Sequence, residues 1–213
     1  MQMDMMAEYI STHMDSILLQ TGQHIVISLI SLTVAALVGI PCGYFASKSG
    51  NFEGLVTTPF QILRVIPSLA FLILFIYIIG TGMIPAVIAL TILAIPPVLL
   101  NTIVGFREVP DHIIESAAGI GMTEKQILKR VRIPLALPLI MAGLRTALVE
   151  VFASTTLAAK IGAGGLGEII FTGLGLNRTD LLVLGGILVA ALALIAGGVF
   201  DLVTRRMMRY KNV

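Results

Sequence analysis

Five apolar stretches, each long enough to cross a lipid bilayer, limit most strongly what this chain can fold into. A helix needs about 20 apolar residues to cross the hydrocarbon core of a membrane. The stretches run over residues 25–44, 55–79, 83–104, 135–157 and 181–203. Only 12% of the 213 residues are charged and 57% are hydrophobic, too few polar residues to cover a water-soluble domain. We therefore predict an all-α membrane protein, a single transmembrane domain over residues 1–213 with five spans.

Basic residues are distributed unequally between the two sides that five spans define. One side receives ten of them: Lys48, Arg107, Lys125, Lys129, Arg130, Arg132, Arg205, Arg206, Arg209 and Lys211. The other side receives only Lys160 and Arg178. Because loops rich in Lys and Arg stay in the cytoplasm, we predict that the C-terminus is cytoplasmic and the N-terminus faces outward. The first 15 residues lack Lys and Arg, so no cleavable signal peptide is expected.

Sites typical of soluble enzymes are not indicated by the sequence. Cys42 is the only cysteine, so no disulfide can form within the chain. The histidines, His13, His24 and His112, are dispersed and form no metal-binding pattern. The P-loop pattern GxxxxGK[ST] does not occur, so the chain is not expected to hydrolyse ATP by that route. We expect neither a cofactor nor a metal on this chain, and the charge pattern does not indicate nucleic acid.

A glycine-rich segment follows the fourth stretch on the predicted outer side. Residues 162–167, Gly-Ala-Gly-Gly-Leu-Gly, match the dinucleotide fingerprint GxGxxG, but no strand precedes them. We interpret the segment as a flexible turn before a short interfacial helix over residues 168–174. It either forms a gate at the outer end of a pathway, with Gly164, Gly165 and Gly167 as candidates, or simply reverses the chain.

One charged segment, residues 110–138, interrupts the apolar sequence on the predicted cytoplasmic side. Pro110 and Asp111 are typical of a helix start, since Asp can cap the helix and its charge suits the N-terminal dipole. Gly119 and Gly121 are expected to end this first short helix, because glycine most easily adopts the left-handed conformation of a helix C-terminus.

A second short helix is predicted directly after these glycines. Thr123 and Gln126 have the spacing of a capping box. Pro134 then either ends this helix or bends it into the fourth span. Two helices this short cannot be stable alone, so their apolar sides must pack on the rest of the chain or on a partner. A loop folded back on the bundle is the structural alternative to a docking element.

The spacing within this segment resembles the cytoplasmic loop of ABC importer permeases. That loop reads EAA, three residues, G, nine residues, then I-x-L-P; here it reads Glu115-Ser116-Ala117, Gly121 and Val131-Arg132-Ile133-Pro134. The resemblance implies that the loop, residues 105–134, docks on a cytoplasmic ATPase. The implied docking residues are Glu115, Ser116, Ala117, Gly119, Gly121, Met122 and Thr123, and the motif ends at Val131, Ile133 and Pro134.

Four other segments, residues 66–72, 94–102, 142–148 and 156–170, resemble the permeases of osmoprotectant importers. The resemblance implies a five-span type I importer permease in the bacterial cytoplasmic membrane that translocates glycine betaine, carnitine, choline or a similar solute. It also implies four kinds of partner: two ATPase subunits that carry ATP and Mg, a second permease subunit of the same or a related chain, an extracytoplasmic solute-binding protein and the lipid membrane. The alternatives are a permease for another small solute such as an amino acid, a secondary transporter or channel, and a purely structural subunit.

Three charged residues fall within predicted spans, where charge is costly and often functional. Arg64 lies near the inner end of its span, where it could reach the headgroups. Arg145 and Glu150 are five residues apart, an imperfect spacing for an ion pair on a helix. Both are candidate pathway residues, and Glu150 is either a counter-charge for a cationic solute or part of a structural ion pair. Quaternary ammonium sites normally use aromatic cages; with no Trp in the chain, tight selection is expected in the separate binding protein.

Overall fold

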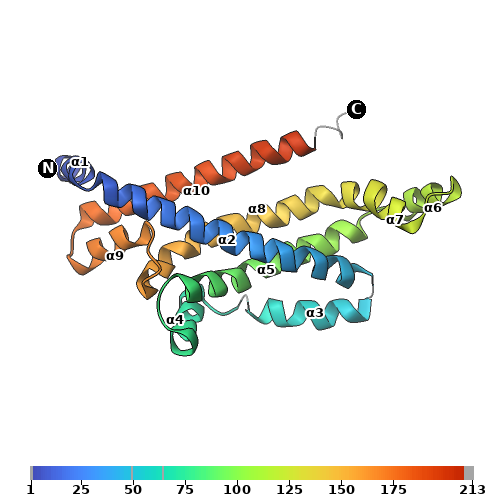
Figure 1. Cartoon of the computed structure of the whole chain (residues 1–213), viewed down its shortest axis with the longest axis horizontal. Coiled ribbons are helices and arrows are strands. Elements are labelled where there is room, and N and C mark those ends of the chain that lie inside the picture. The colour runs from blue at the N-terminus through green and yellow to red at the C-terminus, as the bar shows by residue number, and fades with distance from the viewer. Residues whose placement is uncertain (1, 49, 64, 209–213) are drawn as a thin grey trace.

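The computed structural model describes residues 2–48, 50–63 and 65–208, and within these ranges it contains helices and loops but no strand. Arg64, Arg209 and Lys211 lie outside the described residues. Figure 1 shows the longest helices lying roughly along one axis. One end holds α1 (Gln2–Thr12) and α9 (Gly167–Gly175), and the other holds α6 (Asp111–Gly119) and α7 (Glu124–Ile127). The all-α prediction is confirmed.

Four helical segments are long and apolar enough to cross a membrane. They are α2 (Met14–Ser47), α5 (Met83–Arg107), the run Glu124–Ile161 and α10 (Thr179–Met207). The run consists of α7, a π-helical turn η1 (Leu128–Arg132), α8 (Ile133–Ala158) and a 3-10 turn η2 (Ala159–Ile161). These segments coincide with the first, third, fourth and fifth apolar stretches of the sequence and extend beyond them.

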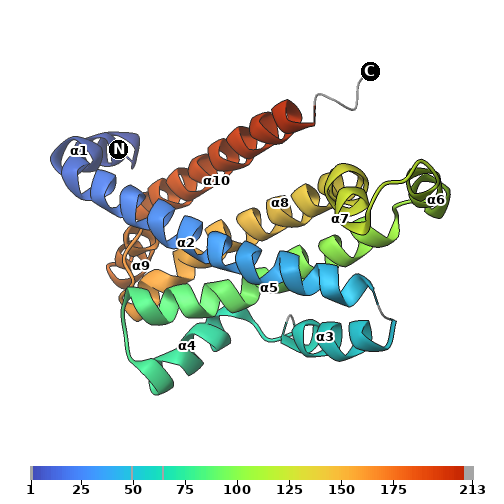
Figure 2. The same ribbon diagram turned by 45° about the vertical axis from the view of Figure 1, so that its right-hand side comes forward.

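The second apolar stretch, predicted as one span over residues 55–79, is not one helix. It forms α3 (Gly50–Leu63) and α4 (Ser68–Ile79), which run in different directions (Figure 2). The break lies at Pro67, whose ψ of 134° is extended, and a proline also disfavours the helical conformation in the residue before it. Because α4 has only 12 residues, it is about 18 Å long and shorter than the hydrocarbon core is thick.

The second short helix and the fourth span are continuous, so Pro134 does not end the helix. Pro134 has no N–H to donate to the carbonyl of Arg130. The turn before it is π-helical, and there the N–H of Ile133 donates to the oxygen of Leu128. The resulting run of 38 residues, Glu124–Ile161, connects the α6–α7 end of the molecule directly to the opposite end.

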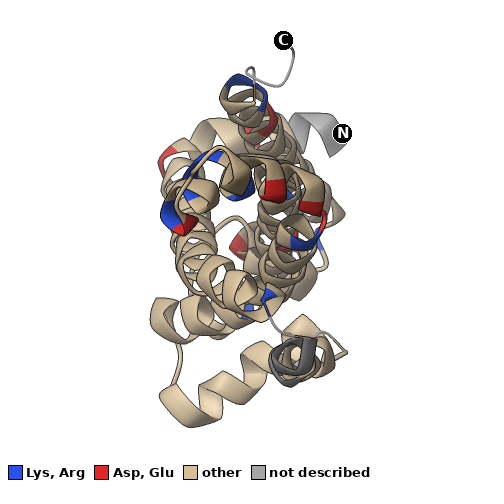
Figure 3. Ribbon diagram, turned by 90° about the vertical axis from the view of Figure 1, so that its right-hand side faces the viewer, with Lys and Arg blue, Asp and Glu red and all other residues tan. Residues whose placement is uncertain are grey.

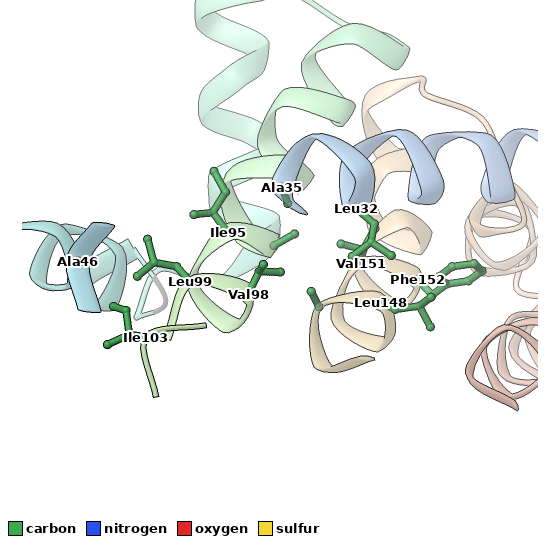
Figure 4. Close-up of a cluster of buried hydrophobic side chains, with 12 residues drawn as sticks. Leu32, Ala35, Ala46, Ile95, Val98, Leu99, Ile103, Leu148, Val151 and Phe152 are labelled. Atoms are coloured by element: carbon green, nitrogen blue, oxygen red, sulfur yellow. The ribbon is translucent and has the colours of Figure 1, made fainter. Parts of the chain in front are cut away.

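The core lies where α5 packs against both α2 and α8. Buried apolar side chains of the three helices form one cluster (Figure 4). Its members include Leu32 and Ala35 of α2, Ile95, Val98 and Leu99 of α5, and Leu148, Val151 and Phe152 of α8. This arrangement fixes α8, which carries Arg145 and Glu150, beside the other two helices.

Glycines set the spacing between these three helices. A Cβ on Gly43 of α2 would lie 2.9 Å from the carbonyl oxygen of Leu99, and one on Gly143 of α8 would lie 2.7 Å from that of Pro97. Both oxygens belong to the α5 backbone, which cannot move aside as a side chain can. Small residues that allow such close approach stabilise helix pairs in membranes.

We expect Gly143→Val to destabilise the protein by about 1–3 kcal/mol, the usual cost of overpacking. The valine would have to displace Pro97 and Asn101 of α5. Gly186→Val is the matched control, because a Cβ there meets no heavy atom within 4 Å. Thermal unfolding in detergent can be followed with a thiol-reactive dye, since Cys42 packs against the core cluster. Equal midpoints for the two variants would contradict the role given to Gly143.

Candidate functional site

The end of the molecule formed by α6 and α7 carries most of the basic residues. There α2, α5 and α10 end and the run Glu124–Ile161 begins (Figures 1 and 2). Figure 3 looks onto this end and shows Lys and Arg on the helices that face the viewer. The described basic residues at this end are Lys48, Arg107, Lys125, Lys129, Arg130, Arg132, Arg205 and Arg206.

The two basic residues at the opposite end have local partners. Nη2 of Arg178 donates to Oδ2 of Asp180 at 2.5 Å. This side-chain hydrogen bond raises the pKa of Arg178 above its ordinary value. Nζ of Lys160 lies 5.1 Å from the centre of the Phe171 ring, an arrangement that stabilises a cation. The basic residues are therefore concentrated at the α6–α7 end of the structure, as their distribution along the sequence indicates.

A hydrogen-bonded glycine cap ends α6 and turns the chain toward α7. Gly121 has a φ of +86°, and its N–H donates to the oxygen of Ala118 at 2.9 Å. The N–H of Met122 donates to the oxygen of Ala117 at 3.1 Å. This pair of bonds is the Schellman motif. It confirms Gly121 as the residue that ends the first short helix, whereas Gly119 is the last residue inside it.

The capping box predicted for the second short helix is present. Oε1 of Gln126 accepts a hydrogen bond from the N–H of Thr123 at 2.8 Å, and α7 begins at the next residue. Ile127 is almost fully buried and ties α7 to the bundle. Together, α6, the glycine cap and α7 form a hairpin, named here the α6–α7 hairpin, that packs on η1.

The hairpin presents most residues of the predicted docking motif at the surface. Glu115, Ser116, Gly119, Gly121 and Thr123 are exposed, and Met122 is half-buried. Ala117 points inward and is 6% exposed, whereas the tip residue Ile120 is 81% exposed. Ile120 is therefore an apolar side chain at the hairpin tip that the described residues leave uncovered. At the end of the motif, Val131 and Pro134 are half-buried and Ile133 is 39% exposed.

Glu150 lies in the wall of a cavity at the break between α3 and α4. The cavity has a volume of about 380 Å³. Its lining consists of Val65, Ile66, Pro67 and Ser68 from the break, Leu90 and Leu93 of α5, and Glu150, Val151, Ala153 and Ser154 of α8. Non-helical backbone is tolerated at membrane depth where it lines a cavity. The break that the sequence reading missed thus places a carboxylate and two serines around one space.

Arg145 forms an ion pair with α10. Its Nε donates to Oδ1 of Asp201 at 2.7 Å. Sequence reasoning considered Glu150 as the partner, because the two residues are close in sequence. Asp201 is 56 residues away, and only the packing of α8 against α10 brings it into reach. Arg145 therefore belongs to the contact between these helices, and the cavity described above is lined by Glu150.

The glycine turn and α9 are held by polar side chains of α2. Three glycines of the turn have positive φ: Gly162, Gly164 and Gly165. Oε1 of Gln23 accepts a hydrogen bond from the N–H of Gly165 at 3.0 Å. Nε2 of Gln20 donates to Oε2 of Glu168 at 2.9 Å. The short helix predicted over residues 168–174 is confirmed as α9, and its first residue, Gly167, lies so close to Thr156 that a Cβ would overlap the carbonyl oxygen.

His24 joins α2 to α8. The sequence assigned no role to this histidine, and its side chain is fully buried. Its Nε2 donates to the carbonyl oxygen of Phe152 at 3.0 Å. Gly165 packs on the ring, at a distance where a Cβ would lie 3.4 Å from Nδ1. No pattern in the sequence singles out Gln20, Gln23 or His24, since each lies in an apolar helix far in sequence from its partner.

Comparisons with known proteins give a consistent result. Residues 35–209 match the model of the family described as binding-protein-dependent transport system inner membrane component. The chain is 42% identical over 193 residues to the carnitine transport permease protein OpuCB of Listeria monocytogenes, covering 91% of this chain and 88% of that protein. It is 37% identical over 204 residues to the glycine betaine/carnitine/choline transport system permease protein OpuCB of Bacillus subtilis, covering 96% and 94%.

The fold is also found in a solved transporter structure. An inward-facing conformation of the MetNI methionine ABC transporter contains a chain that superposes with a TM-score of 0.75 at 24% identity. The match covers 92% of this chain and 97% of that chain. At this level of identity the likeness shows the fold.

We expect Gly164→Ala to loosen the glycine turn more than Gly162→Ala does. The φ values of 83° and 77° mean that alanine strains the backbone similarly at both positions. A Cβ on Gly164 would in addition collide with the side-chain amide of Gln23, whereas near Gly162 the closest atom is 4.0 Å away. Hydrogen exchange of residues 162–167, measured by mass spectrometry, should therefore be faster in Gly164→Ala. Equal exchange in both variants would contradict the role of Gln23 as an anchor.

Proposed function

The chain belongs to the family of binding-protein-dependent transport system inner membrane components, and on this basis we propose that it is the permease subunit of an ATP-driven importer of quaternary ammonium osmoprotectants. The substrate class, glycine betaine, carnitine, choline or a similar solute, is supported by the two relatives of 42% and 37% identity that carry these names. The observation that carries the ATP-driven mechanism is the exposed α6–α7 hairpin at the basic end.

In the proposed topology the whole chain, residues 1–213, is one permease domain that crosses the bacterial cytoplasmic membrane five times. Four crossings are the long apolar helices, and α3 and α4 together make the remaining one. In this topology the basic end lies in the cytoplasm, and the excess of Lys and Arg around the α6–α7 hairpin supports that orientation. The N-terminus and α9 then lie on the outer side, where an extracytoplasmic solute-binding protein delivers the solute.

The proposed partner of the α6–α7 hairpin is a cytoplasmic ATPase that carries ATP and Mg. Two such subunits would grip two permease subunits, either identical or related chains. The docking residues on this chain are Glu115, Ser116, Ala117, Gly119, Gly121, Met122 and Thr123, with Ala117 supporting the surface from beneath. The loop motif that ends in Val131, Ile133 and Pro134 would join the docking surface to α8.

The run Glu124–Ile161 provides a route for the ATPase motion. Its 38 residues are continuously helical, so a displacement of the α6–α7 hairpin moves the base of the same helical run that bears Glu150 and leads into the glycine turn. Two-state closure of the ATPases would then alternate the pathway between its outward-open and inward-open forms. Gly164, Gly165 and Gly167 are the proposed gate residues, because this turn lies where the run ends.

We expect Gly121→Val to abolish solute-stimulated ATP hydrolysis while the protein stays in the membrane. A β-branched residue does not tolerate a φ of +86°, so the cap that orients α6 would be lost. The assay is ATP hydrolysis by the complete transporter, reconstituted with its ATPase and solute-binding protein. Gly186→Val, on the exposed side of α10, serves as the control. Normal stimulation in Gly121→Val would show that the hairpin is not the docking element.

The cavity at the break between α3 and α4 is the proposed passage for the solute's ammonium head. Glu150 supplies a negative charge, and the hydroxyl groups of Ser68 and Ser154 supply polar contacts within an otherwise apolar lining. Such a site attracts a cation without enclosing it. The ion pair of Arg145 and Asp201 would stabilise α8 against α10 beside this passage.

We expect Glu150→Gln to raise the KM for choline about two- to fivefold, because a partly exposed charge interaction contributes up to about 1 kcal/mol. Glycine betaine carries its own carboxylate, so its KM should change less. The measurement is uptake of radiolabelled choline, glycine betaine and methionine by the reconstituted importer, with Glu108→Gln as a control outside the cavity. Unchanged choline kinetics would exclude Glu150 as the counter-charge. Wild-type uptake of methionine alone would overturn the proposed substrate class.

A further inference from the structure

A basic cavity lies at the α6–α7 end of the bundle, between the end of α2 and the start of the run Glu124–Ile161. It has a volume of about 240 Å³. Its lining consists of Tyr44, Lys48, Glu124, Lys125, Leu128 and Arg132. Three cationic side chains and one carboxylate leave an excess of positive charge around this space. None of the proposed docking residues between 115 and 123 lines it, and none of the proposed pathway residues does.

An apolar cavity adjoins the basic one. It has a volume of about 230 Å³ and is lined by Ile40, Pro41, Tyr44, Phe106, Leu128, Ile133 and Ile140. Tyr44 and Leu128 line both cavities, so the two spaces are neighbours with these side chains between them. The combined surface is cationic at one end and apolar at the other, with a tyrosine at the boundary.

Two cationic side chains of the basic cavity, Arg132 and Lys48, form no ion pair with a carboxylate of the described residues. Nε of Arg132 is buried and has no hydrogen-bond partner among the described residues. A buried guanidinium N–H without an acceptor is costly. The Arg132 side chain as a whole is half-buried, so an acceptor from another molecule would reach its Nη groups. Nζ of Lys48 lies over the ring of Tyr44, 4.5 Å from its centre, so this ammonium group is fixed at the boundary between the cavities.

The position of the cavities along α2 corresponds to the edge of a bilayer. Lys48 directly follows the last residue of α2, Ser47. Ile40 lies eight residues earlier, about 12 Å deeper along the helix. In the topology proposed above, the first apolar stretch ends at residue 44, which places the basic cavity at headgroup level and the apolar cavity beside the hydrocarbon.

We propose that the two cavities form one binding site for an anionic phospholipid of the cytoplasmic leaflet. Its phosphate would contact Lys48, Lys125 and Arg132, and one acyl chain would lie along Ile40 and Phe106. Basic pockets between helices on the cytoplasmic side of membrane proteins bind such headgroups. The leaflet and the depth rest on the topology proposed above, whereas the charge of one cavity and the apolar lining of the other do not.

A lipid in this site would touch the joint between the docking element and the membrane. Leu128 and Arg132 are the first and last residues of the π-helical turn η1, through which the α6–α7 hairpin connects to α8. π-Helical turns within α-helices occur frequently at functional sites. The lipid stiffens this turn, so anionic lipid should improve the coupling of ATP hydrolysis to transport.

The test is retention of lipid by the purified complete transporter after delipidation. Phosphatidylglycerol or phosphatidylcholine is added back, and retained lipid is counted by native mass spectrometry. The wild type should retain phosphatidylglycerol in preference to phosphatidylcholine. In the double variant Lys48→Gln, Arg132→Gln this preference should fall about tenfold or more, the effect of two basic residues at a membrane surface. Unchanged assembly with the ATPase on size-exclusion chromatography shows that the variant is folded.

The matched control is the double variant Lys129→Gln, Arg130→Gln, which removes the same charge from exposed side chains of the same turn that do not line the cavity. It should retain lipid as the wild type does; an equal loss would mean a diffuse charge effect and overturn the proposal. Glycerol 1-phosphate should not displace the lipid, and displacement by it would indicate a free-phosphate site instead. Retention only after the ATPase is removed would assign the cavity to the ATPase interface.

These measurements are independent of transport. If the wild type fails to take up quaternary ammonium solutes but retains phosphatidylglycerol at this site, the proposed substrate class falls and the lipid site stands. If uptake is normal and the lipid preference is absent, only the lipid site falls. An ATPase assay in vesicles with and without phosphatidylglycerol should show weaker solute stimulation without it, and no difference between the two would overturn the coupling role.

Discussion

The hydrophobic effect does not hold helices together inside a bilayer, so this fold depends on how closely α5 can approach α2 and α8. Lipid tails are as apolar as leucine, and helix association therefore rests on packing and on interhelical hydrogen bonds. Here Gly43 and Gly143 bring two helices against the backbone of α5. Two further contacts, from His24 to Phe152 and between Ser28 and Thr155, join α2 directly to α8. Once these three helices are fixed, the positions of the break in the α3–α4 segment and of the glycine turn are determined.

The same packing makes one helical run the structural link between the two ends of the molecule. The run Glu124–Ile161 begins in the α6–α7 hairpin, passes the cavity with Glu150 and ends at the glycine turn. Its interior is stiff because α5 supports it on one side, and α10 contributes through the ion pair of Arg145 and Asp201. Its least regular part is the π-helical turn at the base, where Pro134 prevents normal hydrogen bonding. A displacement of the hairpin therefore reaches α8 through one irregular, π-helical turn and then through a helix that is packed against α5 and α10.

Features encoded locally could be predicted from the sequence, and features that depend on contacts between distant residues could not. The capping box of Thr123 and Gln126 and the glycine cap at Gly121 require only neighbouring residues, so spacing was sufficient. The break at Pro67 was missed because apolar composition continues through it and prolines are common in membrane helices. Asp201 as the partner of Arg145, and the contacts of Gln23 and His24, involve separations of 56 to 142 residues. No periodicity within one helix records which residue of another helix will face it.

A weak site in the middle of the pathway is consistent with transport, because a solute that binds tightly there would not leave. The lining of the cavity around Glu150 contains aliphatic, proline and serine side chains but, among the described residues that form it, no aromatic ring. Aromatic faces are what give quaternary ammonium sites their affinity, whereas a single carboxylate beside water attracts a cation only modestly. Selection by an aromatic cage would have to occur before the solute enters this cavity. Passage through the cavity would then need only a negative charge that lowers the cost of bringing a cation into the membrane interior. If the cavity is the passage, as proposed, its lining is consistent with a selective binding step that precedes a permissive passage.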